Sequence, residues 1–322
     1  MSNKLIIGVP SKGRLQENTH AFFARAGLKL VRERGERDYR GGLVGFDTIE
    51  VQYLSASDIA GELARGGIHL GITGEDLIRE NIPDANAKVT LLTPLGFGHA
   101  NVVVAVPQAW IDVRSMSDIE DVAASFRART GNRMRVATKY INLTRQHFSQ
   151  HNVSDYRIVE SLGATEGAPA AGAAEMVVDI TTTGATLAAN ALKIINDGVI
   201  LKSEANLVAA HTAGWGTDTL GVAKVILGRI SAEETARTTR EVRAHMATGA
   251  GLIATEIAQL FGAQMPYGAA QSYIAFHCAK DKAAELAEWL VQKGASHVSV
   301  QALDYVFSNR NPLFEMLEMR VV

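Results

Sequence analysis

Short apolar runs alternate with helical patterns along the first two thirds of the chain, and this alternation constrains the fold more than any other feature. Each run has the length and composition of a buried strand. Between two of them, Asp58 can cap a helix that ends at Gly66 and Gly67, where glycine accommodates a left-handed C-cap. The order strand, helix, strand predicts an α/β fold. The runs cover residues 5–9, 49–54, 69–73, 102–106, 134–138, 157–160 and 176–180.

Helix-breaking residues interrupt this pattern at residues 93–98, before the strand predicted from residue 102. We interpret this segment as a crossing between two lobes, although an ordinary surface loop fits it equally well. A return crossing near Asn190 would make the first lobe discontinuous. The predicted organisation is a first lobe at residues 1–98 and 191–228, a second lobe at residues 99–190, and a third unit at residues 229–322.

The sequence pattern changes after Leu227. Ser231 and Glu234 form a capping-box pattern ahead of a long helical stretch, and residues 251–261 predict another helix. The remaining tail predicts a small α+β module. Its expected elements are strands at residues 271–278, 296–307 and 314–322, and a helix at residues 281–293.

Length, charge and cysteine content narrow the class of protein. A chain of 322 residues favours two or three compact units, and a formal net charge of −2 offers no overall attraction to nucleic acid or acidic membranes. The single cysteine, Cys278, cannot form an intrachain disulfide. The N-terminal segment lacks the pattern of a signal peptide, and no run has the length of a membrane-spanning helix. We therefore expect a cytoplasmic protein that binds neither nucleic acid nor membranes.

The most informative segment is residues 177–187, where a buried strand ends in hydroxyl residues before a helical run. Backbone N–H groups at a helix N-terminus, together with threonine hydroxyls, can bind a phosphate dianion, and Gly184 allows close approach of the main chain. Asp179 at the strand end could accept hydrogen bonds from ribose hydroxyls. A threonine-rich helix cap without a ligand explains the local pattern equally well.

Three further strand ends carry polar groups. Lys12, Gly13 and Arg14 follow the first strand, and residues 71–77 and 137–145 follow two others. Lysine and arginine could together neutralise a polyphosphate, although an exposed basic turn explains the first segment alone at least as well. Glycine, cation and hydroxyl clusters after four separate strands favour one shared cleft. Glu166 could reach this cleft or simply be solvated.

Four segments resemble, in order and spacing, the signature segments of the ATP phosphoribosyltransferase family. The resemblance covers about residues 4–227 and implies a two-lobed core like that of periplasmic binding proteins, with the active site between the lobes. The remaining tail matches in position the C-terminal regulatory domain, a ferredoxin-like module, of the family's long form. The segments are Pro10-Ser11-Lys12-Gly13-Arg14-Leu15, Gly71-Ile72-Thr73-Gly74-Glu75-Asp76-Leu77, Val136-Ala137-Thr138-Lys139-Tyr140-Ile141-Asn142-Leu143-Thr144-Arg145 and Asp179-Ile180-Thr181-Thr182-Thr183-Gly184-Ala185-Thr186-Leu187.

The resemblance also implies a set of site residues, of which Lys12, Arg14 and Asp179 are expected to be catalytic. The expected residues for phosphoribosyl pyrophosphate (PRPP) are Glu166, Asp179, Thr182, Thr183, Gly184, Ala185 and Thr186. Those expected around ATP and pyrophosphate are Lys12, Gly13, Arg14, Thr73, Gly74, Asp76, Lys139, Tyr140, Asn142 and Arg145.

The family reaction displaces pyrophosphate from PRPP by N1 of the ATP adenine, with Mg²⁺ carried mainly on the substrate phosphates. The resemblance further implies feedback inhibition by histidine and a homo-oligomer, either dimer or hexamer. One departure is the predicted helical character of residues 231–261, because the tail of the long form begins with a strand. Two other functions stay open: a two-lobed ligand sensor or solute-binding protein without catalysis, and a PRPP-dependent transferase with another base as acceptor.

Overall fold

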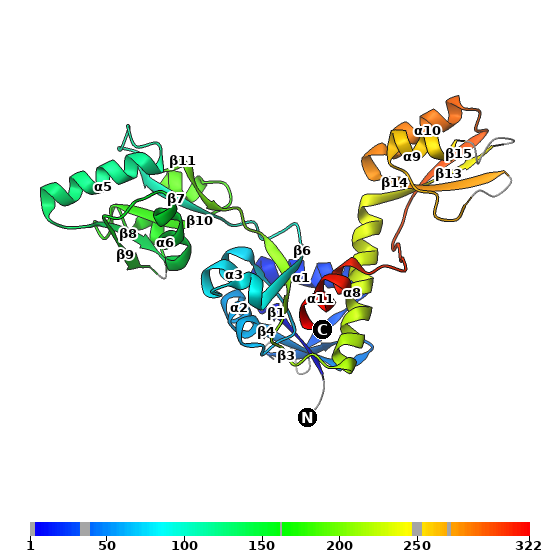
Figure 1. Ribbon diagram of the computed structural model, residues 1–322, viewed down its shortest axis with the longest axis horizontal. Helices are drawn as coiled ribbons and strands as arrows, with labels where there is room; N and C mark the ends of the chain where they lie inside the picture. Colours follow the sequence, from blue (N-terminus) through cyan, green and yellow to red (C-terminus); the bar gives the residue numbers. More distant parts are fainter. Residues whose placement is uncertain (1–3, 33–38, 162, 247–252, 269–271) are drawn as a thin grey trace. The chain divides into compact units, whose positions relative to one another are not determined.

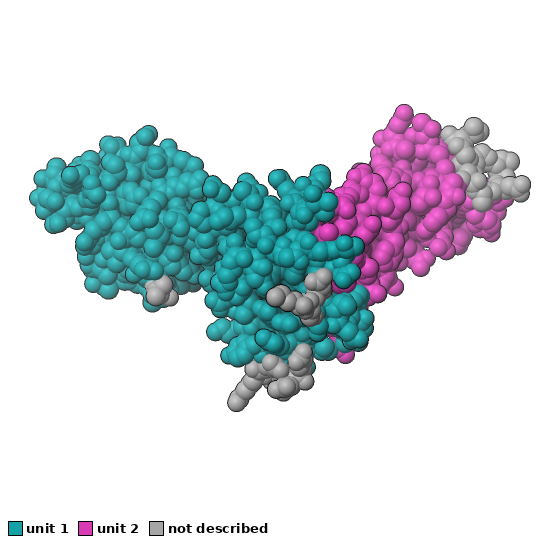
Figure 2. All heavy atoms as spheres, turned by 60° about the horizontal axis from the view of Figure 1, so that its bottom comes forward, with its two compact units in different colours: residues 1–22, 30–219, 319–322 teal, residues 23–29, 220–318 magenta. Residues whose placement is uncertain are grey.

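The structure, a computed structural model, describes residues 4–32, 39–161, 163–246, 253–268 and 272–322. Two compact units divide the chain (Figure 2). The first contains residues 1–22, 30–219 and 319–322, and the second contains residues 23–29 and 220–318. No helix in the described part of the chain is both long and apolar enough to cross a membrane.

A seven-stranded sheet with β1 at its centre forms the first half of unit 1. β1 pairs in parallel with β4 and β5, and β12 pairs antiparallel with β5. Leu5, Ile7 and Val9 on one face of β1 are fully buried, and Gly8 on the other face is buried as well, as expected for a strand covered on both faces. Across the sheet the strands are β2 (Leu30–Arg32), β3 (Arg40–Leu43), β4 (Phe46–Leu54), β1 (Leu5–Pro10), β5 (Leu70–Gly74), β12 (Ala205–Ala210) and β6 (Val89–Pro94).

Helices connect the strands of this sheet. The cap of α2 is Ser55, whose hydroxyl accepts a hydrogen bond from Asp58 N at 3.1 Å, and Gly66 ends the helix in the left-handed conformation. The prediction that Asp58 is the cap was wrong because Asp58 occupies the third helical position, from which its carboxylate accepts a bond from the Ser55 hydroxyl. The helices are α1 (Gly13–Arg25), α2 (Ala56–Arg65), α3 (Glu75–Asn81) and α4 (Ala85–Lys88).

A five-stranded sheet forms the other half of unit 1. β8 pairs in parallel with both β9 and β10, whereas β7 pairs antiparallel with β10 and β11. The strands, in order across the sheet, are β11 (Leu192–Leu201), β7 (Asn101–Pro107), β10 (Met176–Thr181), β8 (Met134–Thr138) and β9 (Tyr156–Glu160). The connecting helices are α5 (Met116–Thr130), α6 (Ile141–Gln150), the 3₁₀ turn η1 (Thr165–Gly167) and α7 (Ala185–Ala189).

The two sheets agree with the α/β prediction, and a strand is present at every run predicted in the core. One boundary differs. The second lobe was predicted to end at residue 190, but its sheet continues to Leu201, because β11 pairs with β7 through a bulge between Ile194 and Val199. The chain therefore returns to the first sheet only at β12.

Two segments cross between the sheets, and they are hydrogen-bonded to each other. One follows β6, within the predicted crossing at residues 93–98, and the other precedes β12. Leu95 N donates to Ala205 O, Ala205 N donates to Phe97 O, and Ala100 N donates to Ser203 O, all at 2.9 Å. The paired backbones satisfy each other's polar groups where the chain leaves the sheets.

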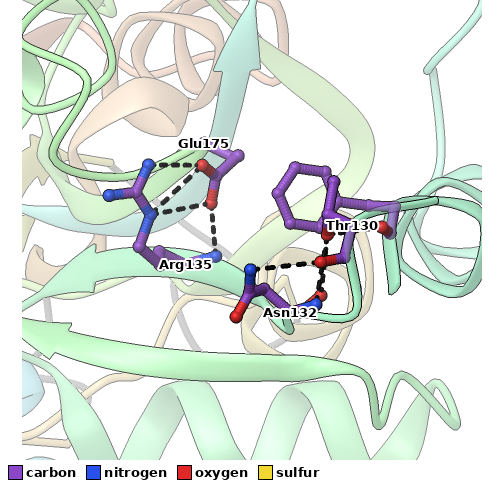
Figure 3. A network of polar contacts seen from close by, with 5 residues as sticks. Thr130, Asn132, Arg135 and Glu175 are labelled. Atoms are coloured by element: carbon purple, nitrogen blue, oxygen red, sulfur yellow. Dashed lines mark hydrogen bonds and ion pairs between the residues drawn. The ribbon is translucent and has the colours of Figure 1, made fainter. Parts of the chain in front are cut away.

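Polar contacts also hold together the amino ends of β8 and β10 (Figure 3). The Glu175 carboxylate accepts hydrogen bonds from the Arg135 guanidinium and from Arg135 N, at 2.6 and 2.5 Å. Thr130 and Asn132 form the turn between α5 and β8, in which Asn132 N donates to the Thr130 hydroxyl at 3.1 Å. These contacts lie at the end of the sheet away from the predicted cleft, so their role is structural.

Unit 2 contains a three-stranded antiparallel sheet in the order β14-β13-β15. α9 and α10 cover one face of this sheet (Figure 1), and Val242, Ile257, Phe276, Leu286 and Leu290 form its core. The elements of this part of the chain are α8 (Thr217–Thr238), β13 (Thr239–His245), α9 (Ala254–Phe261), β14 (Tyr273–Ala279), the 3₁₀ turn η2 (Lys280–Lys282), α10 (Ala283–Gln292), β15 (His297–Ala302) and α11 (Pro312–Val321). α8 begins before residue 220 and α11 ends after residue 318, so both helices extend past the bounds of unit 2.

Three predictions for the tail were wrong. Ser231 is not a cap but lies inside α8, which begins at Thr217. The helical stretch ends at Thr238, because Val242 and Ala244 alternate into the core as part of β13. After α8 the tail therefore starts with a strand, β13, as the resemblance to the family's long form implies. The difference expected from the helical pattern of residues 231–261 is not present. Residues 251–252 of the predicted helix and residue 271 of the predicted strand lie outside the described residues.

The third correction concerns residues 314–322, which form α11 rather than a strand. Pro312 occupies the first helical position, where it costs no hydrogen bond, and the Asn311 side chain accepts from Phe314 N at 3.2 Å. Leu313, Phe314 and Leu317 are buried together, at the spacing of one helix face. This segment therefore presents no strand edge that could pair across subunits.

Candidate functional site

The predicted site segments follow strands that are neighbours within each sheet. β1 and β5 are parallel neighbours, so the turns at residues 12–14 and 73–76 lie at the same edge of the first sheet. β8 and β10 are parallel neighbours in the second sheet. Residues 139–142 and 179–186 therefore also share an edge, which is where open α/β sheets bind ligands.

The threonine-rich loop at residues 181–186 has the backbone of a phosphate-binding turn. Gly184 adopts a φ of 79° and precedes α7, a conformation that strains any residue with a Cβ. The Thr181 hydroxyl accepts from Gly184 N at 2.7 Å, and the Thr182 hydroxyl donates to His99 O at 3.0 Å. Thr183, Ala185 and Thr186 are exposed. The loop is thus fixed from within while its outer side chains stay accessible.

Asp179 lies beside this loop, together with Lys139 and Glu166. The register of β8 and β10 pairs Thr138 with Val178, so Lys139 and Asp179 are the next residues of the two strands. Burial raises the pKa of the Asp179 carboxyl, and Glu166 adds to this effect. A hydrogen bond from Ile180 N and the Lys139 ammonium act in the opposite direction. The structure therefore brings two acidic groups and one cation to the entrance of the loop.

Lys12 lies directly before α1, and Gly13 and Arg14 are the first two residues of this helix; all three are exposed. Gly13 adopts a φ of 69°, which places the chain in the left-handed region as it enters the helix. Within the part of the chain that the structure describes, neither Lys12 nor Arg14 makes an ion pair or hydrogen bond with Asp179. The two cations are accessible.

Tyr140 and Asp76 connect the two sheets directly. The Tyr140 hydroxyl donates to Asp76 Oδ2 at 2.8 Å, and the Ser203 hydroxyl donates to Asp76 Oδ1 at 2.9 Å. All three residues are buried. Burial, and next the negative charge of Asp76, raise the pKa of the Tyr140 hydroxyl, so it stays protonated as the donor. Asp76 and Tyr140 are therefore already bonded to each other.

Other residues predicted around ATP also have protein partners. Thr73 is fully buried and its hydroxyl donates to Ala56 O at 2.7 Å. A Cβ on Gly74 would lie 2.2 Å from Asp76 Oδ1, so a side chain at this position would displace that carboxylate. Asn142 Nδ2 donates to Glu80 O at 2.9 Å. Arg145 is exposed and lies close enough to Tyr156 to lower its hydroxyl pKa against the larger effect of burial.

Sequence reasoning missed Glu80 and Ser203. Glu80 lies one helical turn after Asp76, so the i, i+4 spacing places the two carboxylates on the same side of α3. Ser203 belongs to the returning crossing segment, for which the sequence contains no recognisable signal. Both residues contact the predicted site segments through hydrogen bonds to Asn142, Leu143 and Asp76.

A cavity of about 930 Å³ lies elsewhere in unit 1, among α3, α4, α6 and the end of β11. Arg79, Glu80, Asn142 and His147 are among its lining residues, whereas Asp179 and the threonine-rich loop are not. This hollow therefore does not coincide with the predicted phosphate site.

Asp179 and Glu166 are two carboxylates near the threonine-rich loop that could contribute to a metal site. The described residues contain no cluster of three or more histidine, cysteine or acidic side chains that could hold a metal by themselves. Two carboxylates beside a phosphate-binding turn suit Mg²⁺, a hard cation that is usually bound by one or two carboxylates plus substrate phosphates.

Comparison with known proteins gives a consistent result. The family described as ATP phosphoribosyltransferase matches residues 55–232. An ATP phosphoribosyltransferase of Nitrobacter winogradskyi is 57% identical over 321 residues, which cover 99% of each chain. One from Rhodopseudomonas palustris is 58% identical over 320 residues, which cover 99% of this chain and 98% of the relative.

Among solved structures, the fold is similar to that of a chain from the ATP phosphoribosyl transferase (HisG:HisZ) complex of Thermotoga maritima. The TM-score is 0.54 at 23% sequence identity, and the match covers 70% of this chain and 96% of that chain. At this identity the similarity supports the fold alone.

Proposed function

Because the chain belongs to the ATP phosphoribosyltransferase family, we propose that it transfers the phosphoribosyl group of PRPP to N1 of the ATP adenine and releases pyrophosphate. This reaction is the first step of histidine biosynthesis. The observation that carries the proposal is the 57% identity to an ATP phosphoribosyltransferase along 99% of both chains. The four signature segments of the chain support it as well. Two follow the parallel neighbours β1 and β5 of the first sheet, and two follow the parallel neighbours β8 and β10 of the second.

In this proposal PRPP binds at the carboxyl end of β10. The 5-phosphate contacts the threonine-rich loop, Thr182 to Thr186, through exposed hydroxyls and through backbone N–H groups other than that of Gly184, which already donates to Thr181. The Asp179 carboxylate accepts hydrogen bonds from the ribose hydroxyls, and Glu166 lies near the sugar. Exposed Thr183 and Thr186, and the left-handed turn at Gly184, support this assignment.

The cations at the other strand ends then contact ATP and pyrophosphate. Lys12, Arg14, Lys139 and Arg145 are all exposed, as contact with a polyphosphate requires. A Cβ on Gly13 would meet no protein atom within 4 Å, so the space beside this residue is open to a ligand. We propose that the remaining residues shape the site rather than contact the substrate through their side chains. The side chains of Thr73, Asp76, Tyr140 and Asn142 are hydrogen-bonded within the protein, and Gly74 leaves room for the Asp76 carboxylate.

The chemistry needs positioning and charge stabilisation more than a strong base. The anomeric carbon gains positive character as pyrophosphate leaves, so Asp179 stabilises the sugar while Lys12 and Arg14 stabilise the departing charge. Mg²⁺, held by the substrate phosphates with Asp179 and Glu166, would neutralise the pyrophosphate when bound. No nucleophilic side chain is required in this scheme.

We further propose that the chain consists of two catalytic lobes, built on its two larger sheets, and a regulatory and assembly domain from about residue 229. Histidine would inhibit through this tail, and the protein would form dimers or hexamers in the cytoplasm. A separate sheet with its own core supports an independent role for the tail. The histidine and oligomer proposals rest on the family resemblance.

The test is pyrophosphate release by the full chain with ATP, PRPP and Mg²⁺. We expect release only when both substrates are present, and none when GTP or free adenine replaces ATP. Release with another base instead of ATP would identify a different PRPP-dependent transferase. Binding of PRPP by calorimetry without any release would contradict catalysis and favour a ligand sensor.

A further inference from the structure

The N-terminus of α6 lacks a cap from its own segment. Tyr140 precedes the helix, and its side chain makes no capping hydrogen bond. The first backbone N–H groups of a helix need an acceptor, which is usually a side chain one residue before the helix. In α6 the acceptor comes from a distant helix, α3.

Glu80 of α3 supplies this acceptor. Its carboxylate accepts from Asn142 N at 2.9 and 3.1 Å and from Leu143 N at 3.0 Å. Its main-chain oxygen accepts from Asn142 Nδ2 at 2.9 Å. Glu80 is only 8% exposed, so water contributes little to solvating this carboxylate. The negative charge also suits the positive end of the α6 dipole.

This contact joins the two halves of unit 1. α3 follows β5 of the first sheet, whereas α6 follows β8 of the second sheet. The position of the turn between β8 and α6 is therefore set by a side chain from the other sheet. Because Lys139 and Tyr140 are the only residues between β8 and α6, Glu80 fixes one end of a very short segment.

The position of the Lys139 ammonium depends on this segment in two ways. Its ammonium lies 5.1 Å from the centroid of the Tyr140 ring, a cation–π distance. Lys139 also follows Thr138, the register partner of Val178, and so lies beside Asp179. A shift at the start of α6 would move the ammonium away from the entrance to the threonine-rich loop.

We propose that Glu80 is a positioning residue that holds the start of α6 and thereby places Lys139 for PRPP. This role rests on the proposed function. It differs from that of an ordinary helix cap because the capped segment carries a substrate-binding cation, so loss of the cap alters substrate affinity as well as stability.

The experiment is a double-mutant cycle in the full chain with Glu80→Ala and Lys139→Ala. We expect Glu80→Ala to raise KM for PRPP by about tenfold in the wild-type background but by less than about twofold beside Lys139→Ala, since coupled residues show non-additive effects. Glu80→Gln, whose single amide oxygen can accept from one N–H group, should lie between wild type and Glu80→Ala.

The matched control is Glu62→Gln. Glu62 lies on α2 of the first sheet, outside the site segments, and its carboxylate bonds to Arg65 rather than to α6. We expect its KM for PRPP to stay unchanged. Amide hydrogen exchange provides a readout independent of activity: Glu80→Ala should speed exchange at Asn142 and Leu143, while Glu62→Gln should not.

Purely additive effects of Glu80→Ala and Lys139→Ala would overturn the inference, as would an unchanged KM in Glu80→Ala despite faster exchange. If Glu80→Ala does not fold, the same cycle is run with Glu80→Gln, and the same criteria apply. Failure of the wild-type chain to bind PRPP or release pyrophosphate would instead contradict the proposed function. The two failures are therefore distinguishable.

Discussion

At the scale of single residues, the proposed site separates into accessible groups and buried supports. Lys12, Arg14 and Thr183 are exposed, whereas Asp76 and Tyr140 are buried and bonded to each other. Sequence motifs alone place all of these residues in one class, because a motif records identity and spacing but not the partner of each polar atom. Substitutions of the two groups should therefore behave differently.

Asp179→Asn should raise KM for PRPP about 10- to 100-fold, because a hydrogen bond to a charged group is worth roughly 1.5–3 kcal/mol. The same change should raise the melting temperature at pH 7. Burial raises the pKa of this carboxyl, and a carboxyl with a raised pKa destabilises the folded state above that pKa. The asparagine oxygen can still accept from Ile180 N.

The stability difference between Asp179→Asn and wild type should shrink as pH falls through the raised pKa of Asp179, because the wild-type carboxyl then becomes neutral. Thermal melts between pH 4 and pH 7, together with PRPP kinetics, check both parts. A variant with lower stability at pH 7 and unchanged KM would show that Asp179 is a structural residue.

Thr183→Val should raise KM for PRPP about tenfold with little change in melting temperature, because it removes an exposed hydroxyl whose hydrogen bond from Ala185 N is long, at 3.4 Å. Thr183→Ser is the matched control, since it keeps the hydroxyl and should stay close to wild type. Equal PRPP kinetics in all three proteins would remove Thr183 from the phosphate assignment.

At the scale of elements, hydrophobic alternation was reliable in the core and misleading at the C-terminus. The pattern Phe314, Met316, Glu318, Arg320 suggests a strand, but Leu313, Phe314 and Leu317 form the buried face of α11. A short segment fits both periods, and the deciding factor is the core against which it packs. Pro312 after Asn311 was the helix-start signal that the alternation concealed.

Leu317→Ala should destabilise the protein by about 2–5 kcal/mol, as expected for truncation of a buried leucine. Leu317 is fully buried in α11, whereas Met319, two residues later, is 77% exposed. Met319→Ala should therefore have almost no effect. Denaturant unfolding of both variants tests the helix, because a strand would place these two residues on the same face and would give them similar effects.

At the scale of the whole molecule, unit 1 holds all the proposed catalytic groups, and unit 2 has a sheet and core of its own. From the change in pattern after Leu227 the sequence predicted a boundary near residue 229, whereas the second unit of the structure contains residues 23–29 and 220–318. The sequence did not anticipate that α8 continues from Thr217 to Thr238 across the boundary. A truncation near Gly228 would cut this helix in its middle, so regulation is better tested in the full chain.

Free histidine should lower the initial rate of the full-length protein, because it binds one conformation of the assembly more tightly than another. A tenfold preference would shift the equilibrium between the two conformations by about 1.4 kcal/mol. Calorimetry and rate measurements with histidine, with alanine as the control amino acid, check this expectation. Absence of both histidine binding and inhibition would mean that the tail has another role.

The sequence by itself determined the α/β class, seven strands of the two larger sheets and the four strand-end segments, because hydrophobic periodicity and glycine or threonine placement are local properties of the chain. The other five strands described in these sheets, β2, β3, β6, β11 and β12, were found only in the structure. Only the tertiary structure decided which polar groups are free. Asp76 bonds to Tyr140, and Glu80 caps a helix that begins 61 residues later, at Ile141. The order of the elements follows from local patterns in the sequence. The hydrogen bonds of Tyr140 with Asp76 and of Asn142 with Glu80 instead join two separate sheets, so they depend on the tertiary structure.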